Sequence, residues 1–267
     1  MVKIGRIREN LPADIVMKGL GKQYPGTATA AVEGVDVTVA AGEVLCIVGA
    51  SGCGKSTVLR MVAGFEEVTS GTLSVATEPV SGPGPDRGVV FQDYGLFPWL
   101  TVAENIAYGP RQARLQRPVV AERTEQALEA VGLTRVSGSF PHQLSGGMQQ
   151  RVAIARVLAN KPSVLLMDEP FGALDALTRV EMQHELQRIQ RAAGITVLFV
   201  THSIEEAVYL GDRVMVMAGG TAHGMPGHVR EIVDVDLPPD RDASSPEFNA
   251  IERHVDGLVH AGHAVRS

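Results

Sequence analysis

The fold is decided by eight consecutive residues, Gly49-Ala50-Ser51-Gly52-Cys53-Gly54-Lys55-Ser56. They satisfy the pattern G-x-x-x-x-G-K-[ST] at every fixed position, and the backbone N–H groups of such a loop wrap a polyphosphate. The flanking residues support this interpretation, because residues 44–48 are apolar throughout and predict a strand buried on both faces. Residues 55–63 then predict a helix that ends at Gly64. A chance glycine-rich turn would not need this order of strand, loop and helix, so the sequence predicts a P-loop nucleotide site.

The residues of this loop have distinct expected roles. Lys55 would reach the β- and γ-phosphates of ATP, the Ser56 hydroxyl would bind Mg²⁺, and Thr57 would lie near the α-phosphate. ATP and Mg²⁺ are therefore the expected cofactors. The candidate nucleotide-binding residues in this segment are Gly49, Ala50, Ser51, Gly52, Cys53, Gly54, Lys55, Ser56 and Thr57.

A pair of carboxylates follows a second predicted buried strand. Residues 164–167 are apolar and end in Asp168-Glu169-Pro170. Charges at the tip of an apolar strand need partners, and Mg²⁺ with water would supply them. Asp168 is the candidate Mg²⁺ ligand, and Glu169 is the candidate general base that polarises the attacking water. The alternative, an Asp-Glu pair that only caps the next turn, is less favoured beside a P-loop.

A third segment, Leu144-Ser145-Gly146-Gly147-Met148, precedes a predicted helix that runs to about Ala159. The N-terminus of that helix carries free N–H groups and partial positive charge, which makes it a site for an anion. The two glycines would let a phosphate from another molecule approach the backbone closely.

Residues 14–235, most of the chain, resemble the ATP-binding cassette (ABC) transporter ATPases in the order of these segments. The resemblance implies an α/β fold: a P-loop NTPase (RecA-like) core with an antiparallel β lobe and an inserted α-helical subdomain. The expected divisions are an ATPase domain at 14–245, with the helical subdomain at about 98–150 inserted in the core, and a C-terminal helix and tail at 246–267. Within the tail, residues 246–258 are the predicted helix.

The resemblance also implies roles for four further residues. Tyr24 would stack on adenine, and Gln92 would contact Mg²⁺ and the attacking water. Asp175 would lie in a loop that crosses to a second subunit, and His202 would sense the γ-phosphate. Simpler roles stay open: Tyr24 as a turn residue before Pro-Gly, Asp175 as a helix N-cap, and His202 as a surface-loop residue followed by an S-x-x-E capping box at 203–206.

Members of this family pair head to tail, with each ATP held between the P-loop of one chain and Ser145, Gly146 and Gly147 of the other. One set of motifs in this chain implies a homodimer or a pair with a homologous chain. The aromatic segment Leu96-Phe97-Pro98-Trp99-Leu100 would contact an integral membrane permease, to which a solute-binding protein delivers its cargo. The alternative is that Phe97 and Trp99 pack under the helical subdomain.

Composition bounds the remaining possibilities. A net charge of −6 and a pI near 5.8 argue against nucleic acid as a partner. No apolar run approaches the length of a membrane span, and residues 1–10 lack a signal-peptide core. Together with the permease contact that the resemblance implies, the expected place is peripheral, on the cytoplasmic face of the inner (plasma) membrane. Cys46 and Cys53 are not expected to form a disulfide, and Cys53 is a candidate for alkylation that ATP would block.

Two clusters are less specific. The arginines at 111, 114, 117 and 123 are expected on a solvated helix face rather than at a lipid or nucleic-acid site. Five histidines follow residue 220, in a spacing that matches no standard zinc pattern: His223, His228, His254, His260 and His263.

Residues 82–92 and 96–102 resemble the nitrate, sulfonate and taurine import branch, so an importer of such a solute is the favoured function. The alternatives are a soluble ABC ATPase of DNA repair or translation, and a P-loop phosphotransferase. The chain ends too early for the regulatory domain of some sugar importers.

Overall fold

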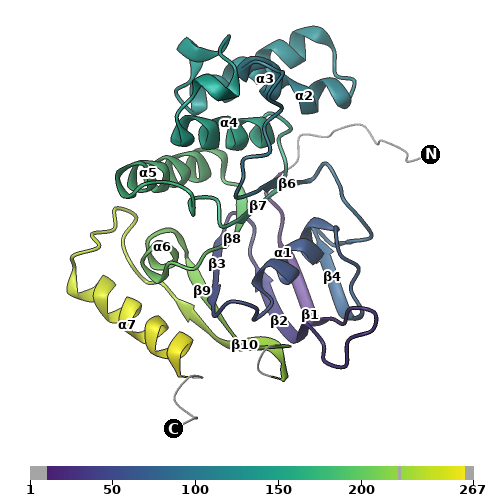
Figure 1. The fold of residues 1–267 in the computed structure, drawn as a ribbon, viewed down its shortest axis with the longest axis vertical. Coiled ribbons are helices and arrows are strands. Elements are labelled where there is room, and N and C mark those ends of the chain that lie inside the picture. Colours follow the sequence, from purple (N-terminus) through teal and green to yellow (C-terminus); the bar gives the residue numbers. More distant parts are fainter. Residues whose placement is uncertain (1–10, 222–223, 262–267) are drawn as a thin grey trace.

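A single mixed sheet runs through the molecule (Figure 1). The computed structural model describes residues 11–221 and 224–261. Its ten strands lie in the order β5-β4-β1-β2-β10-β9-β3-β8-β7-β6. The strands are β1 Ile15–Lys22, β2 Val32–Val39, β3 Val44–Gly49, β4 Ser70–Val75, β5 Glu78–Pro79, β6 Arg87–Val90, β7 Val164–Asp168, β8 Thr196–Val200, β9 Arg213–Gly220 and β10 Met225–Asp234.

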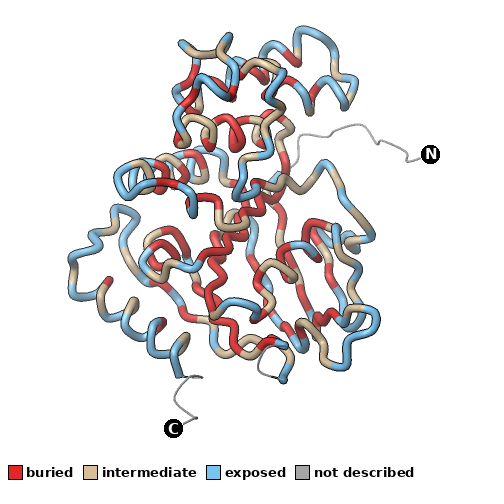
Figure 2. Tube along the Cα trace, in the orientation of Figure 1, coloured by how far each residue is buried: buried red, intermediate tan, exposed pale blue. Residues whose placement is uncertain are grey.

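Strands β6, β7, β8, β3 and β9 are parallel and form the core of the sheet. Every residue of β3 is buried, as the apolar run predicts. Successive side chains of a strand point to opposite faces. Cys46 and Val48 therefore pack into one hydrophobic cluster with α4 and α5, while Leu45 and Ile47 pack into a second cluster with α1. Figure 2 shows this buried band crossing the centre of the molecule.

The antiparallel lobe is made by β1, β2, β4 and β5. In β2 the buried residues are Val32, Val35, Val37 and Val39, whereas Asp36 and Thr38 are exposed. This alternation leaves one face of the strand in solvent. A single parallel pairing of Gly227 in β10 with Val32 joins the lobe to the core strands.

Three helices form the layer at the top of Figure 1: α2 Val102–Gln112, α3 Arg117–Ala130 and α4 Gly146–Leu158. A capping box begins α2, because the Glu104 backbone N–H donates to Thr101 Oγ1 at 3.3 Å and the Thr101 N–H donates to Glu104 Oε2 at 2.9 Å. α4 leads from this layer back to β7, so a division at residue 150 falls inside a continuous helix.

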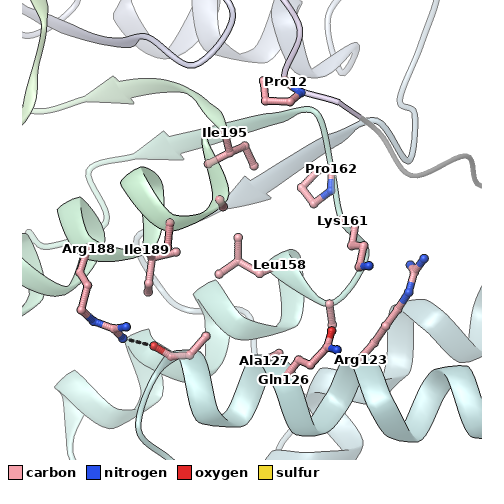
Figure 3. A pocket seen from close by; sticks show the side chains of 14 residues that line it. Pro12, Arg123, Gln126, Ala127, Leu158, Lys161, Pro162, Arg188, Ile189 and Ile195 are labelled. Atoms are coloured by element: carbon pink, nitrogen blue, oxygen red, sulfur yellow. Dashed lines mark hydrogen bonds between the residues drawn. The ribbon is translucent and has the colours of Figure 1, made fainter.

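The predicted solvated arginine face is correct for only three of its four members. Arg111, Arg114 and Arg117 are exposed, but Arg123 is buried. α3 carries Arg123 toward α4 and α5, where it lines a cavity of about 400 Å³ together with Leu158 (Figure 3). The pattern of charges alone could not show which side of α3 faces the other helices.

The other helices are α1 Lys55–Ala63, α5 Ala176–Ala193, α6 Ile204–Leu210 and α7 Pro246–His260, together with the 3₁₀ turns Thr134–Val136 and Pro141–Gln143. α7 confirms the predicted C-terminal helix and packs against α6 and β9. Within the described ranges, no helix combines the length and the apolar character needed to cross a bilayer.

The described histidines of the C-terminal part have separate partners. His254 Nε2 lies 2.9 Å from Glu231 Oε1, and His228 Nδ1 lies 3.1 Å from the Pro226 carbonyl. Among residues 11–221 and 224–261, no group of three His, Cys, Asp or Glu side chains is placed to hold a metal. His223 and His263 fall outside the described residues.

Candidate nucleotide-binding and hydrolysis site

The P-loop connects the end of β3 to the start of α1, as the sequence predicts. Its glycines are needed for packing as well as for access to phosphate. Gly54 has a φ of 99°, and a Cβ there would lie 2.4 Å from Val32 Cγ2. Gly52 has a φ of 80°, but a Cβ there would meet no atom within 4 Å. Gly52 therefore faces open space, which leaves room for a ligand.

Lys55 is buried at the first turn of α1, although it is charged. Its ammonium donates to the Gly49 carbonyl at 2.8 Å and to the Ala50 carbonyl at 3.1 Å. A buried charge needs such partners, and these two carbonyls hold the side chain against the curved loop. This places the ammonium on the loop that would enclose the phosphates.

A cavity of about 360 Å³ opens beside the loop and brings most of the predicted site residues together. Its lining comes from the β lobe, the P-loop and the ends of the core strands. The lining residues are Tyr24, Thr27, Ala31, Ser51, Gly52, Gly54, Lys55, Ser56, Thr57, Glu169, His202 and Thr221.

Two oxygen ligands suited to Mg²⁺ meet at this site. Ser56 Oγ from α1 donates a hydrogen bond of 2.9 Å to Asp168 Oδ1 at the end of β7. Hydroxyl and carboxylate oxygens are the ligands that Mg²⁺ prefers, and it accepts one or two protein groups alongside water and phosphate oxygens. The donor set therefore fits the expected metal.

Glu169 occupies a strained position directly after Asp168. Its φ is 49°, in the left-handed region that residues other than glycine rarely adopt. Its backbone N–H donates to the Val200 carbonyl at 2.9 Å, and its Oε1 lies 2.6 Å from His202 Nε2. Strained backbone of this kind often occurs where function requires a fixed side-chain direction. Here it directs the carboxylate toward the histidine at the edge of the cavity.

Gln92 lies beside Glu169 but does not line the P-loop cavity. Both residues line a neighbouring cavity of about 290 Å³ with Phe171, Arg179 and His202. The structure thus places Gln92 near the predicted general base, in the cavity that adjoins the P-loop cavity.

Tyr24 lies at the nucleotide cavity and is also part of a turn, while its stacking on adenine stays a prediction. It lines the P-loop cavity, and its carbonyl accepts a hydrogen bond of 3.2 Å from the Thr27 N–H within a turn. The buried Lys22 ammonium lies 5.1 Å from the centre of the Tyr24 ring and 3.1 Å from Glu66 Oε2. Lys22, which the sequence did not single out, thereby supports the ring from one side.

Asp175 is the N-cap of α5, which was the simpler of its two predicted roles. Thr178 donates to its carboxylate from the backbone at 3.0 Å and from the hydroxyl at 2.8 Å. These two hydrogen bonds lower the pKa of Asp175. Its crossing to a second subunit stays a prediction.

The segment 145–147 begins α4 away from the P-loop cavity of its own chain. Ser145 is the N-cap, and its Oγ accepts a hydrogen bond of 3.3 Å from the Met148 N–H. Neither Ser145 nor the two glycines lines the P-loop cavity. The start of α4 instead packs beside Tyr94 and Thr178.

In the aromatic segment after Gln92, of the two aromatic rings only Phe97 packs against the helical subdomain, and contact of the segment with a permease stays a prediction. Trp99 is 71% exposed, whereas Phe97 is partly buried, with its ring centre 4.5 Å from that of Tyr108. Arg156 of α4 holds the segment: Nη1 donates to the Gly95 carbonyl at 2.6 Å, and the guanidinium lies 5.5 Å from the centre of the Phe97 ring. No sequence signal identified Arg156, because its partners lie 61 residues earlier in the chain.

Two expectations were wrong, one about the reactivity of Cys53 and one about the capping box at 203–206. Cys53 is completely buried, and burial raises the pKa of its thiol, so it is not a readily alkylated group. Cys46 and Cys53 are both free, as predicted. The capping box at 203–206 is only half formed: the Glu206 N–H donates to Ser203 Oγ at 3.2 Å, but the Glu206 carboxylate bonds Thr201 and Gln183.

The chain matches known proteins over most of its length. A family profile described as ABC transporter matches residues 32–172. The nitrate import ATP-binding protein of Synechococcus elongatus is 47% identical over 228 residues, which cover 84% of this chain and 82% of that protein. The aliphatic sulfonates import ATP-binding protein of Bacillus licheniformis is 42% identical over 227 residues, 85% of this chain and 86% of that protein.

A solved structure also aligns closely with the fold. The ATP-binding cassette MJ0796, in a dimeric post-hydrolysis state bound to ADP and Pi, matches with a TM-score of 0.70 and 30% sequence identity. The alignment covers 84% of this chain and all of that chain.

Proposed function

This chain belongs to the ABC transporter family and hydrolyses ATP to ADP and phosphate, and we propose that it drives a bacterial importer of small anions. One observation supports the site assignment most strongly. Glu169 and His202 lie 2.6 Å apart at the edge of a cavity that the P-loop residues Lys55 and Ser56 also line.

The proposed reaction uses residues already placed around that cavity. Lys55 and the P-loop N–H groups hold the phosphates, and Tyr24 stacks on the adenine. A water oxygen attacks the γ-phosphorus, the bond to the β-phosphate oxygen breaks, and Glu169 accepts the proton that the water loses. His202 donates a hydrogen bond to the γ-phosphate. In the structure the same nitrogen, Nε2, lies 2.6 Å from Glu169 Oε1, so the carboxylate and the phosphate would compete for this donor.

Mg²⁺ is proposed as the metal, held by Ser56 and Asp168 with Gln92 close by. When bound, it neutralises charge on the β- and γ-phosphate oxygens. The 2.9 Å hydrogen bond between Ser56 and Asp168 supports this assignment, because it brings the two oxygen ligands to one place without a metal.

We propose that the functional unit is a homodimer with two ATP molecules at its interface. Ser145, Gly146 and Gly147 present a helix N-terminus that does not line the cavity of its own chain. A second copy could place its ATP against these N–H groups, with Asp175 near the same interface. MJ0796 forms a dimer of this kind of cassette.

The proposed membrane partner is a permease that contacts Leu96–Leu100 at the cytoplasmic face. The exposed Trp99 beside Phe97 and Tyr108 supports this, because exposed aromatic groups are typical of the centres of protein interfaces. The names of the two relatives point to nitrate or sulfonates as the class of solute. In the proposed complex no residue of this chain touches the solute, which the permease and a solute-binding protein select.

The decisive test of the dimer and of the roles of Glu169 and Ser145 is size-exclusion chromatography with Mg-ATP. Glu169→Gln should bind ATP without hydrolysing it and elute as a dimer. The matched double variant Glu169→Gln/Ser145→Arg should bind ATP but stay monomeric. A Glu169→Gln chain that remains monomeric in saturating ATP would contradict the proposed interface.

The solute class needs a second experiment. Cells that express the chain with its own permease and solute-binding protein should take up labelled nitrate, taurine or an alkanesulfonate, and Glu169→Gln should abolish the uptake. Unchanged uptake of all three would remove the small-anion proposal and leave the ATPase activity in place.

A further inference from the structure

A buried carboxylate lies beneath the proposed catalytic histidine. Glu206, in the first turn of α6, is 4% exposed and does not line the P-loop cavity. One of its oxygens accepts a hydrogen bond from the Thr201 hydroxyl, and the other accepts from Gln183 Nε2 at 3.2 Å. Both hydrogen-bond donors are buried. A buried carboxylate is unfavourable unless such partners satisfy it, so its presence here calls for a reason.

These hydrogen bonds enclose the turn that carries His202. Thr201 precedes the histidine and donates to Glu206, while Thr201 Oγ1 accepts from the Ser203 N–H at 3.0 Å. Ser203 follows the histidine, and its Oγ accepts from the Glu206 N–H at 3.2 Å. Both neighbours of His202 in the chain are therefore hydrogen-bonded to Glu206. The His202 side chain itself is half exposed and reaches Glu169 Oε1 at 2.6 Å.

The same carboxylate connects this turn to α5. Gln183 lies one helical turn after Arg179, whose Nη2 donates to the Leu174 carbonyl at 3.0 Å. Leu174 directly precedes Asp175, the N-cap of α5. Burial raises the pKa of Glu206, whereas its hydrogen bonds from Thr201 and Gln183 and the nearby Arg179 charge lower it, and the Glu205 charge raises it. One face of α5 thus supports both the Asp175 loop and the His202 turn.

We propose that Glu206 is a positioning residue for ATP hydrolysis, which fixes the turn that carries His202 and ties its position to the Asp175 loop. The inference rests on the proposed role of His202. Glu206 does not line the P-loop cavity, although it lines the neighbouring cavity with Gln92, Glu169 and His202. Its carboxylate bonds Thr201 and Gln183 rather than a group assigned to the reaction, so the proposed action is through the turn that it closes.

The test is a double-mutant cycle on ATPase activity in the full-length chain. Glu206→Gln keeps the shape of the side chain but replaces one acceptor oxygen with an NH2 donor, so the hydrogen bond from Thr201 or the one from Gln183 is lost or reversed in direction. We expect kcat to fall at least about tenfold, with KM for ATP within about twofold of the parent. In a His202→Ala background, measured with radiolabelled ATP, the same substitution should cause no further loss.

The neighbouring Glu205→Gln is the matched control, since Glu205 is exposed on the same turn of α6. It removes the same charge and should leave kcat unchanged. Thr201→Val is the second probe, because it deletes the hydroxyl that joins Ser203 to Glu206 and keeps the shape of the side chain. It should also lower kcat and show no additional effect without His202. If Glu206→Gln does not fold, Thr201→Val takes its place in the cycle.

Each outcome has one meaning. Normal kcat in both probe variants, or full additivity with His202→Ala, overturns the positioning role while the proposed role of His202 stands. If His202→Ala itself keeps parental turnover, the proposed role of His202 fails, and the positioning role fails with it. Loss of kcat that disappears in the His202→Ala background supports both.

Discussion

Replacement of Gly54 by alanine should destabilise the chain even in the absence of nucleotide. The position has a φ of 99°, and left-handed backbone costs an L-residue about 1–2 kcal/mol. The new Cβ would also lie 2.4 Å from Val32 Cγ2 and 3.1 Å from the Ala31 carbonyl. Such overpacking costs about 1–3 kcal/mol, whereas the loss of glycine freedom in the unfolded chain returns about 0.4–1 kcal/mol. The expected net loss in the free energy of unfolding is about 1–5 kcal/mol.

Gly52→Ala is the matched control for this prediction. Gly52 has a φ of 80°, so the backbone term is similar, but no atom lies within 4 Å of the new Cβ. Its expected loss is about 1 kcal/mol or less. Urea denaturation of both variants without nucleotide measures the difference. Equal destabilisation by the two substitutions would refute the claim that Gly54 is required by its contact with Val32.

The remaining predictions concern binding, hydrolysis, pH and reactivity. Lys55→Ala should lose tight ATP binding in a fluorescence titration, and retained tight binding would contradict its phosphate role. Ser145→Arg should bind ATP normally but lose hydrolysis, and near-normal turnover would exclude action across the dimer. Burial raises the pKa of Glu206 above its ordinary value of 4.5, so the folded state holds this proton more tightly than the unfolded state. The free energy of unfolding should therefore fall as pH rises from 4.5 through the folded pKa of Glu206. Glu206→Gln should remove this part of the pH dependence, measured by urea titrations at several pH values. An unchanged dependence of stability on pH in the variant would contradict the prediction. Cys53 should resist maleimide labelling in the folded chain with or without ATP, and ATP-sensitive labelling would show that the loop opens.

Local sequence patterns were sufficient for the elements that carry the motifs. The apolar run of β3 and the alternation of valines with polar residues in β2 can both be recognised from neighbouring residues alone. The P-loop could be placed because its spacing combines with a buried strand before it and a helix after it. These features need no information from distant parts of the chain.

The errors share a cause of the opposite kind. Glu206 fits a capping box by spacing, but its carboxylate is taken by Thr201 and by Gln183, which lies 23 residues earlier. Arg123 fits a charged helix face, but it is buried beside a cavity that residues of α4 and α5 also line. In both cases tertiary contacts decide the outcome, and no local pattern records them. The positive φ of Glu169, which follows β7 and donates its N–H to the Val200 carbonyl of β8, is likewise not recorded in a local pattern.

The contacts of Arg156 with the Tyr94–Phe97 segment bear on how movement of the permease would affect ATP hydrolysis in the proposed transporter. Arg156 belongs to α4, the helix that begins at Ser145, and it holds the Tyr94 and Gly95 carbonyls. A permease that displaces Phe97 would therefore also tilt the helix end that meets the partner chain's ATP. In the proposed dimer, a displacement by the permease would therefore bear on the neighbouring chain's nucleotide through α4, as well as on the chain's own site through Gln92, which precedes this segment and lines a cavity with Glu169.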